Sequence, residues 1–237
     1  MTTAEKLVQI AENEQKIYDK GFEDGKVQGG GGDNWYDTFW DTYQANGNRE
    51  NYGFAFAGHG WTDETFKPEY DMRVTSGSYM FHSCKITNLK AILEKQGVTL
   101  DFSNSTNLTY LFNGSSVSDV GVVDARSCPD LNYCFYAAKL VNIEKFIVNE
   151  NNVFRGCFTG TSRIVEIRFE GNISSNLSIS TNTGLSHDSL MSIIEHLADK
   201  SDDTSGTELV LTIGSTNIEK LTEEELEVAR QKGWQVN

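Results

Sequence analysis

Phenylalanine recurs at a fixed spacing in the middle of the chain, and this pattern predicts a repeating architecture. Phe112, Phe135 and Phe158 follow one another at intervals of 23 residues, and Phe81 lies upstream of them at a longer interval. Aliphatic residues follow the first three phenylalanines at plus five and plus eight, and follow Phe158 one position later. These residues are Ile86, Leu89, Val117, Val120, Leu140, Ile143, Ile164 and Ile167. A period of about 20 to 29 residues is typical of leucine-rich repeats.

The expected fold is therefore an α/β repeat, a short leucine-rich-repeat solenoid over residues 80–180. Each coil would bury its phenylalanine and aliphatic residues only by stacking on its neighbours. Cys134 and Cys157 occupy equivalent positions on neighbouring coils, which favours two small buried side chains over a disulfide. The longer step after Phe81 contains Leu89 and Leu93 at helical spacing, so this coil is expected to carry a short outer helix.

The pattern changes after Ile179 and predicts a helix-strand-helix C-terminal cap over residues 181–237. Ser186 is the expected N-cap of the first helix, and residues 208–213 form the expected strand. Thr222 and Glu225 have the spacing of a capping box at the start of the second helix. Such a cap would cover the apolar end of the repeats.

Residues 1–32 predict an N-terminal coiled-coil-like helix and a glycine linker that together join copies of the chain. Apolar residues and glycines repeat at three-four and four-residue spacings, and they form the expected contact between helices. The residues assigned to this oligomerisation are Leu7, Ile10, Glu14, Ile17, Gly21 and Gly25. A homo-oligomer, with three copies as the expected number, would form through residues 4–28. A frayed tail is the alternative, because glycine costs a helix about 1 kcal/mol relative to alanine.

Residues 33–79 are rich in aromatic side chains and allow two interpretations. They can form an aromatic N-terminal cap that packs on the first coil, or they can bind sugars through exposed ring faces. Trp35, Trp40, Tyr52 and Trp61 are the candidate binding residues. The sequence pattern alone does not separate the two interpretations.

Composition excludes some classes of partner. The formal net charge of −14 disfavours a nucleic-acid partner, which is bound through clustered Lys and Arg. No run approaches the length of a membrane span and no signal peptide is recognised at Met1, so we expect no membrane insertion. The cysteine spacing does not match a zinc site, and no catalytic motif is present, so we predict no metal, no cofactor and no enzymatic activity. His187 and His196 are nine residues apart on one helix, a spacing that does not place two ligands on one face.

The segments "YLFNGSSVSDVGVVDARSC" and "CFYAAKLVNIEKFIV" resemble BspA-type leucine-rich repeats. The flanking segments "FWDTYQANGNRENYGFAFAGHGWTDETFKPEYD" and "SHDSLMSIIEHLAD" are similar to proteins encoded by phages and prophages of gut Firmicutes. The resemblance implies a role in a phage tail or baseplate, or in adhesion to a host.

The function expected from this resemblance is a non-enzymatic virion protein that binds the host surface. Its partners would be other virion proteins and a host surface glycan or protein, and it would be made in the host cytoplasm and carried in the virion. The first alternative is a bacterial adhesion or protein-binding module in the bacterial cytoplasm or on the cell surface. The second alternative is a cell-wall glycan hydrolase.

Overall fold

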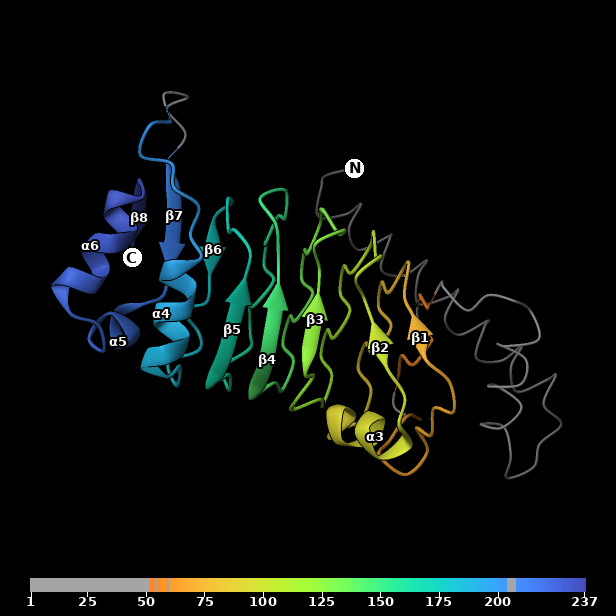
Figure 1. The fold of residues 1–237 in the computed structure, drawn as a ribbon. Coiled ribbons are helices and arrows are strands. Elements are labelled where there is room, and N and C mark those ends of the chain that lie inside the picture. Colours follow the sequence, from red (N-terminus) through yellow and green to blue (C-terminus); the bar gives the residue numbers. More distant parts are fainter. Residues whose placement is uncertain (1–51, 54, 59, 204–207) are drawn as a thin grey trace, which may run out of the picture. The chain divides into compact units, whose positions relative to one another are not determined.

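The computed structural model describes residues 52–53, 55–58, 60–203 and 208–237. The chain divides into two compact units, 1–49 and 50–237, and all described residues belong to the second. The assignments of Trp35, Trp40 and the six oligomerisation residues lie outside the described residues and stay predictions. Figure 1 shows the second unit as a row of short strands with its helices at the periphery.

The described strands form three small parallel sheets. The first contains β1 (Met72–Arg73) and β2 (Leu100–Asp101), and the second contains β3 (Val122–Asp124), β4 (Asn142–Ile147) and β5 (Glu166–Glu170) in that order. The third contains β6 (Leu177–Ser178), β7 (Leu209–Thr212) and β8 (Trp234–Val236). The described helices are α3 (Leu89–Gln96), α4 (His187–Glu195), α5 (Ser215–Ile218) and α6 (Glu223–Gln231).

The predicted fold class, a leucine-rich-repeat solenoid, is wrong. The described residues form three separate parallel sheets of two, three and three strands with few helices, which is a mixed α/β fold. The second sheet ends at β5, where serines of helix α4 take the place of a next strand. A regular spacing of apolar residues therefore predicted the packing of the rings but not a continuous sheet.

The phenylalanine rings predicted to stack do form a column in the core. The ring centroids of Phe81 and Phe112 are 5.2 Å apart, those of Phe112 and Phe135 are 5.8 Å apart, and Phe158 follows at 5.3 Å. Phe56 extends the column at 5.3 Å from Phe81, although the sequence pattern assigns it to the aromatic N-terminal segment. All five rings are at most 1% exposed. Burial of each ring contributes roughly 1.5–3 kcal/mol.

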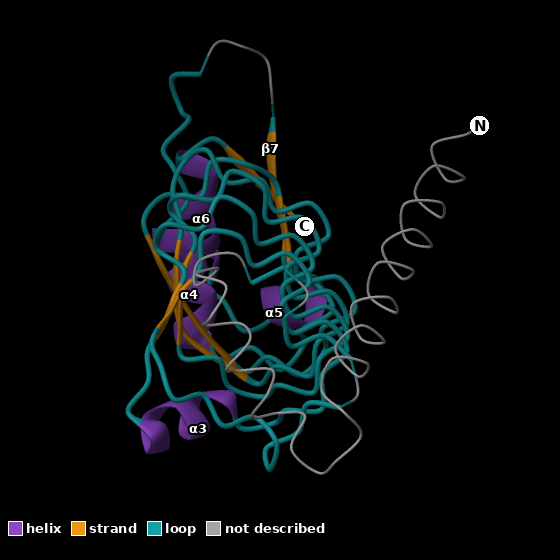
Figure 2. Ribbon diagram, turned by 90° about the vertical axis from the view of Figure 1, so that its right-hand side faces the viewer, coloured by secondary structure: helices purple, strands orange, loops and turns teal. Residues whose placement is uncertain are grey.

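Backbone hydrogen bonds join each turn to the next beside this column. In the central turns the donors are the phenylalanine and the residues two before and two after it, and the acceptors lie in the following turn. The bonds of one such set are Tyr110 N to Asn132 O at 3.2 Å, Phe112 N to Cys134 O at 2.8 Å and Gly114 N to Tyr136 O at 2.8 Å. Figure 2 looks along the row of strands, and the successive turns superimpose in that view.

The residues two before the phenylalanines are tyrosines with left-handed backbones. Tyr79, Tyr110 and Tyr133 have φ values of 56°, 58° and 56°. This region normally strains a side chain with a Cβ atom. The three rings stack with centroids 4.6 and 5.0 Å apart, which offsets part of that strain. The next equivalent residue is Gly156, where a Cβ atom would lie 2.5 Å from the ring of Tyr133.

The four cysteines are free and buried, as predicted for Cys134 and Cys157. Burial raises the pKa of Cys84 to about 12 and that of Cys128 to about 11, and it also raises the pKa of Cys134. These three thiols are therefore protonated at neutral pH and pack as small apolar groups.

The helix predicted in the long Phe81-to-Phe112 step is confirmed as α3, and a carboxylate from an earlier turn holds its start. Asp63 accepts hydrogen bonds from the backbone nitrogens of Thr87 at 2.6 Å and Asn88 at 3.3 Å, and from both side chains. Partial burial raises the pKa of Asp63, but the hydrogen bonds from Thr87 and Asn88 outweigh it and lower the pKa overall. This contact fixes the helix that carries Lys90.

The C-terminal segment confirms the predicted caps and adds two elements. Ser186 caps α4, and the box of Thr222 and Glu225 starts α6. The predicted strand is β7, but a helix α5 and a further strand β8 follow it, and β8 pairs with β7. Trp234 of β8 is 2% exposed and donates its indole N–H to Ala198 O at 2.9 Å.

Replacing Ala137 with glycine should stabilise the protein. Ala137 has a φ of 52° and is exposed, and its equivalents in the neighbouring turns are Gly114 and Gly160. Relief of the left-handed strain outweighs the entropy that glycine adds to the unfolded chain, so we expect A137G to raise the free energy of unfolding by about 0.5 kcal/mol in urea titrations. The control A91G, in helix α3, should lower it by about 0.5–1 kcal/mol. A loss of stability in A137G would show that the turn tolerates alanine without strain.

Candidate functional site

Charged side chains of both signs meet at a shallow, open depression over β4, β5 and α4. Its volume is about 380 Å³. The lining residues are Glu144, Lys145, Arg168, Phe169, Asp188, Met191, Ser192, Glu195 and His196. The strands supply both cations, Lys145 and Arg168, while α4 supplies the carboxylates Asp188 and Glu195.

An irregularity in β4 places two successive charged residues at this surface. Ile143 pairs with Ile167 and Phe146 pairs with Phe169, so β4 has one more residue than β5 between these pairs. Such a bulge turns side chains out of strict alternation. Glu144 and Lys145 are therefore both exposed, whereas Ile143 and Phe146 on either side are buried.

The charges of β4 are held by neighbouring ion pairs. Lys90 of α3 lies 2.6 Å from a Glu144 oxygen, and Lys145 lies 2.9 Å from a Glu170 oxygen. The hydrogen bond to Glu144 raises the pKa of Lys90, and the hydrogen bond to Glu170 raises the pKa of Lys145. Both ammonium groups consequently keep their charge at neutral pH.

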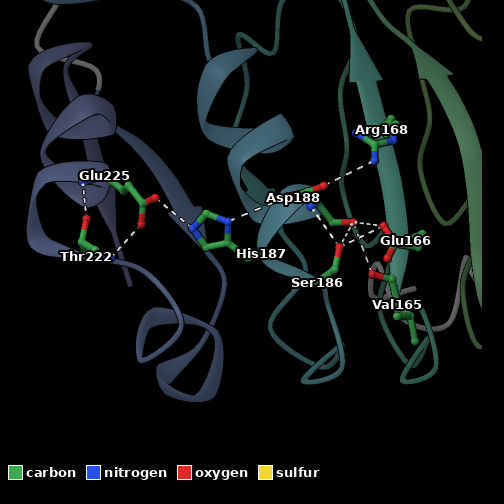
Figure 3. A network of polar contacts seen from close by, with 9 residues as sticks. Val165, Glu166, Arg168, Ser186, His187, Asp188, Thr222 and Glu225 are labelled. Atoms are coloured by element: carbon green, nitrogen blue, oxygen red, sulfur yellow. Dashed lines mark hydrogen bonds and ion pairs between the residues drawn. The ribbon is translucent and has the colours of Figure 1, made fainter.

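The N-terminal end of α4 contacts both β5 and α6 (Figure 3). Three successive residues each contact a different side chain, two of them on β5 and one on α6. These pairs are Ser186 with Glu166 at 2.9 Å, His187 with Glu225 at 2.8 Å, and Asp188 with Arg168 at 3.7 Å. The position of α4 against the sheet and against α6 is therefore set at its N-terminal end.

The carboxylate of Glu225 divides its two oxygens between its own helix and α4. One oxygen accepts the backbone N–H of Thr222 at 2.8 Å, and the other lies 2.8 Å from His187 Nε2. The hydrogen bond from Thr222 lowers the pKa of Glu225, and His187 lowers it further. Glu225 is therefore ionised at neutral pH and accepts its hydrogen bond from His187 Nε2.

Two serines of α4 complete the hydrogen bonding of β5. Ser189 Oγ accepts the backbone N–H of Ile167 at 3.0 Å, and Ser192 Oγ accepts that of Phe169 at 2.9 Å. A further strand would otherwise take these donors, since buried backbone N–H groups are almost always paired. The sequence pattern predicts only Ser186 as a cap, although the three-residue spacing of Ser186, Ser189 and Ser192 marks one helix face.

Side chains at the C-terminal end of α4 make fewer contacts with other elements than those at its N-terminal end. The Nδ1 of His196 lies 2.8 Å from the carbonyl oxygen of Ser192. Since a carbonyl oxygen can only accept, Nδ1 donates this hydrogen bond. Lys232 Nζ donates to the carbonyl oxygens of Ile194 at 3.1 Å and Glu195 at 2.6 Å. Burial lowers the pKa of Lys232, and its contacts anchor the backbone while the carboxylate of Glu195 stays exposed.

The described residues do not bring the predicted binding residues together at this depression. Tyr52 and Trp61 are each 4% exposed, and the ring of Trp61 meets that of Phe56 edge-on at 5.3 Å. Their burial makes them part of the core rather than an open platform for sugars. His187 and His196, predicted not to share a metal, lie at opposite ends of α4, and the described residues contain no cluster of three metal-binding side chains.

Comparison with protein-family models, with curated proteins and with solved structures gives no match to this chain. Among the described residues no helix is both long and apolar enough to cross a membrane.

Replacing Ser192 with alanine should expose the unsatisfied edge of β5. The buried N–H of Phe169 loses its acceptor, which costs about 1–3 kcal/mol of the free energy of unfolding. Amide hydrogen exchange should show faster exchange at Phe169, while S162A, at an exposed serine outside the depression, should leave stability and exchange unchanged. Unchanged protection of Phe169 in S192A would mean that another acceptor serves this group.

Proposed function

We propose that this chain is a non-enzymatic phage virion protein that binds the host surface through the depression over β4, β5 and α4. Residues 1–32 join copies of the chain and attach them to other virion proteins. The charged depression on the outer side of the second sheet is the observation that carries the binding role. The assignment to a virion is supported by the resemblance of the sequence to proteins of phages and prophages of gut Firmicutes.

The shape of the depression favours a large partner. Sites for small molecules bury most of the ligand surface in a concave pocket. The open depression over β4 and β5 leaves one side of any ligand in solvent, which suits a group attached to a polymer or to a larger surface. Charges of both signs at such a surface contribute mainly to specificity and to the rate of association.

The scaffold beneath the depression suits a binding surface that must keep its shape. Ile143, Phe146, Ile167 and Phe169 of β4 and β5 are buried on the inner side, and α4 closes the outer edge of β5. Side chains mounted on strands of this kind are positioned more accurately than side chains on loops. The partner would therefore meet a prearranged set of charges.

A free-standing bacterial binding module is the second candidate. The unit of residues 50–237 has a compact core of its own, which would support binding without an assembled particle. The two candidates differ in the role of residues 1–32 and not in the binding surface.

Removal of the two strand cations should weaken attachment to host cell walls. We expect the K145Q/R168Q variant to bind isolated cell walls of gut Firmicutes about 30-fold less than the unchanged chain in a sedimentation assay, because each of the two lost ion pairs costs about 1 kcal/mol. The variant K139Q/R163Q has the same change of net charge at exposed residues outside the depression and should bind normally. Equal binding by both variants would contradict the proposed surface, and release of soluble wall fragments would instead support a hydrolase.

The mass in solution should separate the two candidates. Light scattering is expected to give a trimer for the full chain and a monomer for a chain that starts at Asp33, because residues 4–28 supply the helical contact. A monomer in both cases would favour the free-standing binding module.

A further inference from the structure

The strands give the depression two cations beside the carboxylate of Glu144, and α4 gives it two further carboxylates. Lys145 and Arg168 extend from neighbouring strands, while Asp188 and Glu195 belong to the helix that faces them. Met191 of α4 adds apolar surface beside these charges. A ligand that fits this arrangement carries a negative and a positive group at opposite ends of an apolar part, because Glu195 lies about 10 Å along α4 from Asp188, the neighbour of Arg168.

Several of these groups are available to a ligand. The shortest contact of Arg168 with Asp188 is 3.7 Å, and the two side chains are 59% and 72% exposed. An exposed pair of this kind is weak. Glu195 is exposed, and its hydrogen bond to Lys232 uses the backbone carbonyl and not the carboxylate. Lys145 already has a carboxylate partner in Glu170, which leaves Arg168 as the main cation for a ligand.

Other ligand chemistries fit less well. A neutral glycan usually needs an exposed aromatic face, and Phe169, which lines the depression, is only 4% exposed. A polyanion would meet the carboxylates of α4 and a chain with a net charge of −14. The volume of about 380 Å³ is suited to a few residues of an extended peptide.

We propose that the depression binds a short peptide by both of its ends, with the terminal carboxylate against Arg168 and the terminal ammonium group against Glu195. Lys145 adds positive potential beside the carboxylate. Met191 contacts the aliphatic part of the peptide. This inference rests on the proposed function, because it names the chemical class of the host group that the same surface would recognise.

The test uses the full chain and trialanine with free termini, which carries one carboxylate and one ammonium group. Chemical-shift changes in ¹H–¹⁵N spectra should show saturable binding with a Kd of about 1 mM, centred on β5 and α4. We expect R168Q and E195Q each to weaken binding about fivefold, the effect of one exposed ion pair. The matched controls R163Q and E150Q change exposed residues outside the depression and should bind trialanine normally.

Blocking one end of the peptide at a time assigns each contact. N-acetyl-trialanine lacks the ammonium group, so its weaker binding should no longer respond to E195Q but should still respond to R168Q. Trialanine amide lacks the carboxylate and should show the opposite dependence. This crossed pattern distinguishes direct contacts from a general loss of structure, which would weaken all three peptides together.

The outcomes separate this inference from the proposed function. If trialanine gives no saturable change at about 10 mM, or if blocking its ends changes nothing, the peptide inference is wrong. Cell-wall binding that depends on Lys145 and Arg168 would then leave the proposed function standing with a different ligand. Crossed peptide binding without cell-wall binding would keep the inference and overturn the proposed host surface.

Discussion

The backbone hydrogen bonds beside the phenylalanine column are the interaction on which the rest of the described unit depends. In each central turn, N–H groups of alternate residues donate to carbonyl oxygens of the following turn. The phenylalanine is the middle donor of each set, and these bonds hold its backbone in place. Its ring lies in the core and meets the ring of the next turn. Polar and apolar contacts reinforce each other, because each aligns the same pair of turns.

This alignment also explains the strained tyrosines. A left-handed backbone at Tyr110 or Tyr133 costs roughly 1 kcal/mol or more relative to glycine. The turn requires that conformation whatever the side chain, and the stacked tyrosine rings return part of the cost. At Gly156 the ring of Tyr133 occupies the space of a Cβ atom, so the tyrosine series ends where only glycine fits.

Sequence reasoning could predict the contacts that repeat, but not those that end the repetition. The spacing of Phe81, Phe112, Phe135 and Phe158 identifies the ring column, and local capping residues identify α4 and α6. The separate sheets were missed because the sheet ends through long-range contacts, such as those of Ser189 and Ser192 with β5. The fold class inferred from the spacing was consequently wrong, although the core residues were correct.

The depression was missed for a related reason. Glu144 and Lys145 are adjacent in the sequence, and strict strand alternation would place them on opposite sides of the sheet. The bulge in β4, which arises from its pairing with β5, brings both to the outer surface beside Arg168. The aromatic content of residues 33–79 suggested a binding site, but Tyr52 and Trp61 of this segment are buried in the core. Composition thus indicates which side chains are able to bind, whereas the register of the strands decides which of them meet a partner.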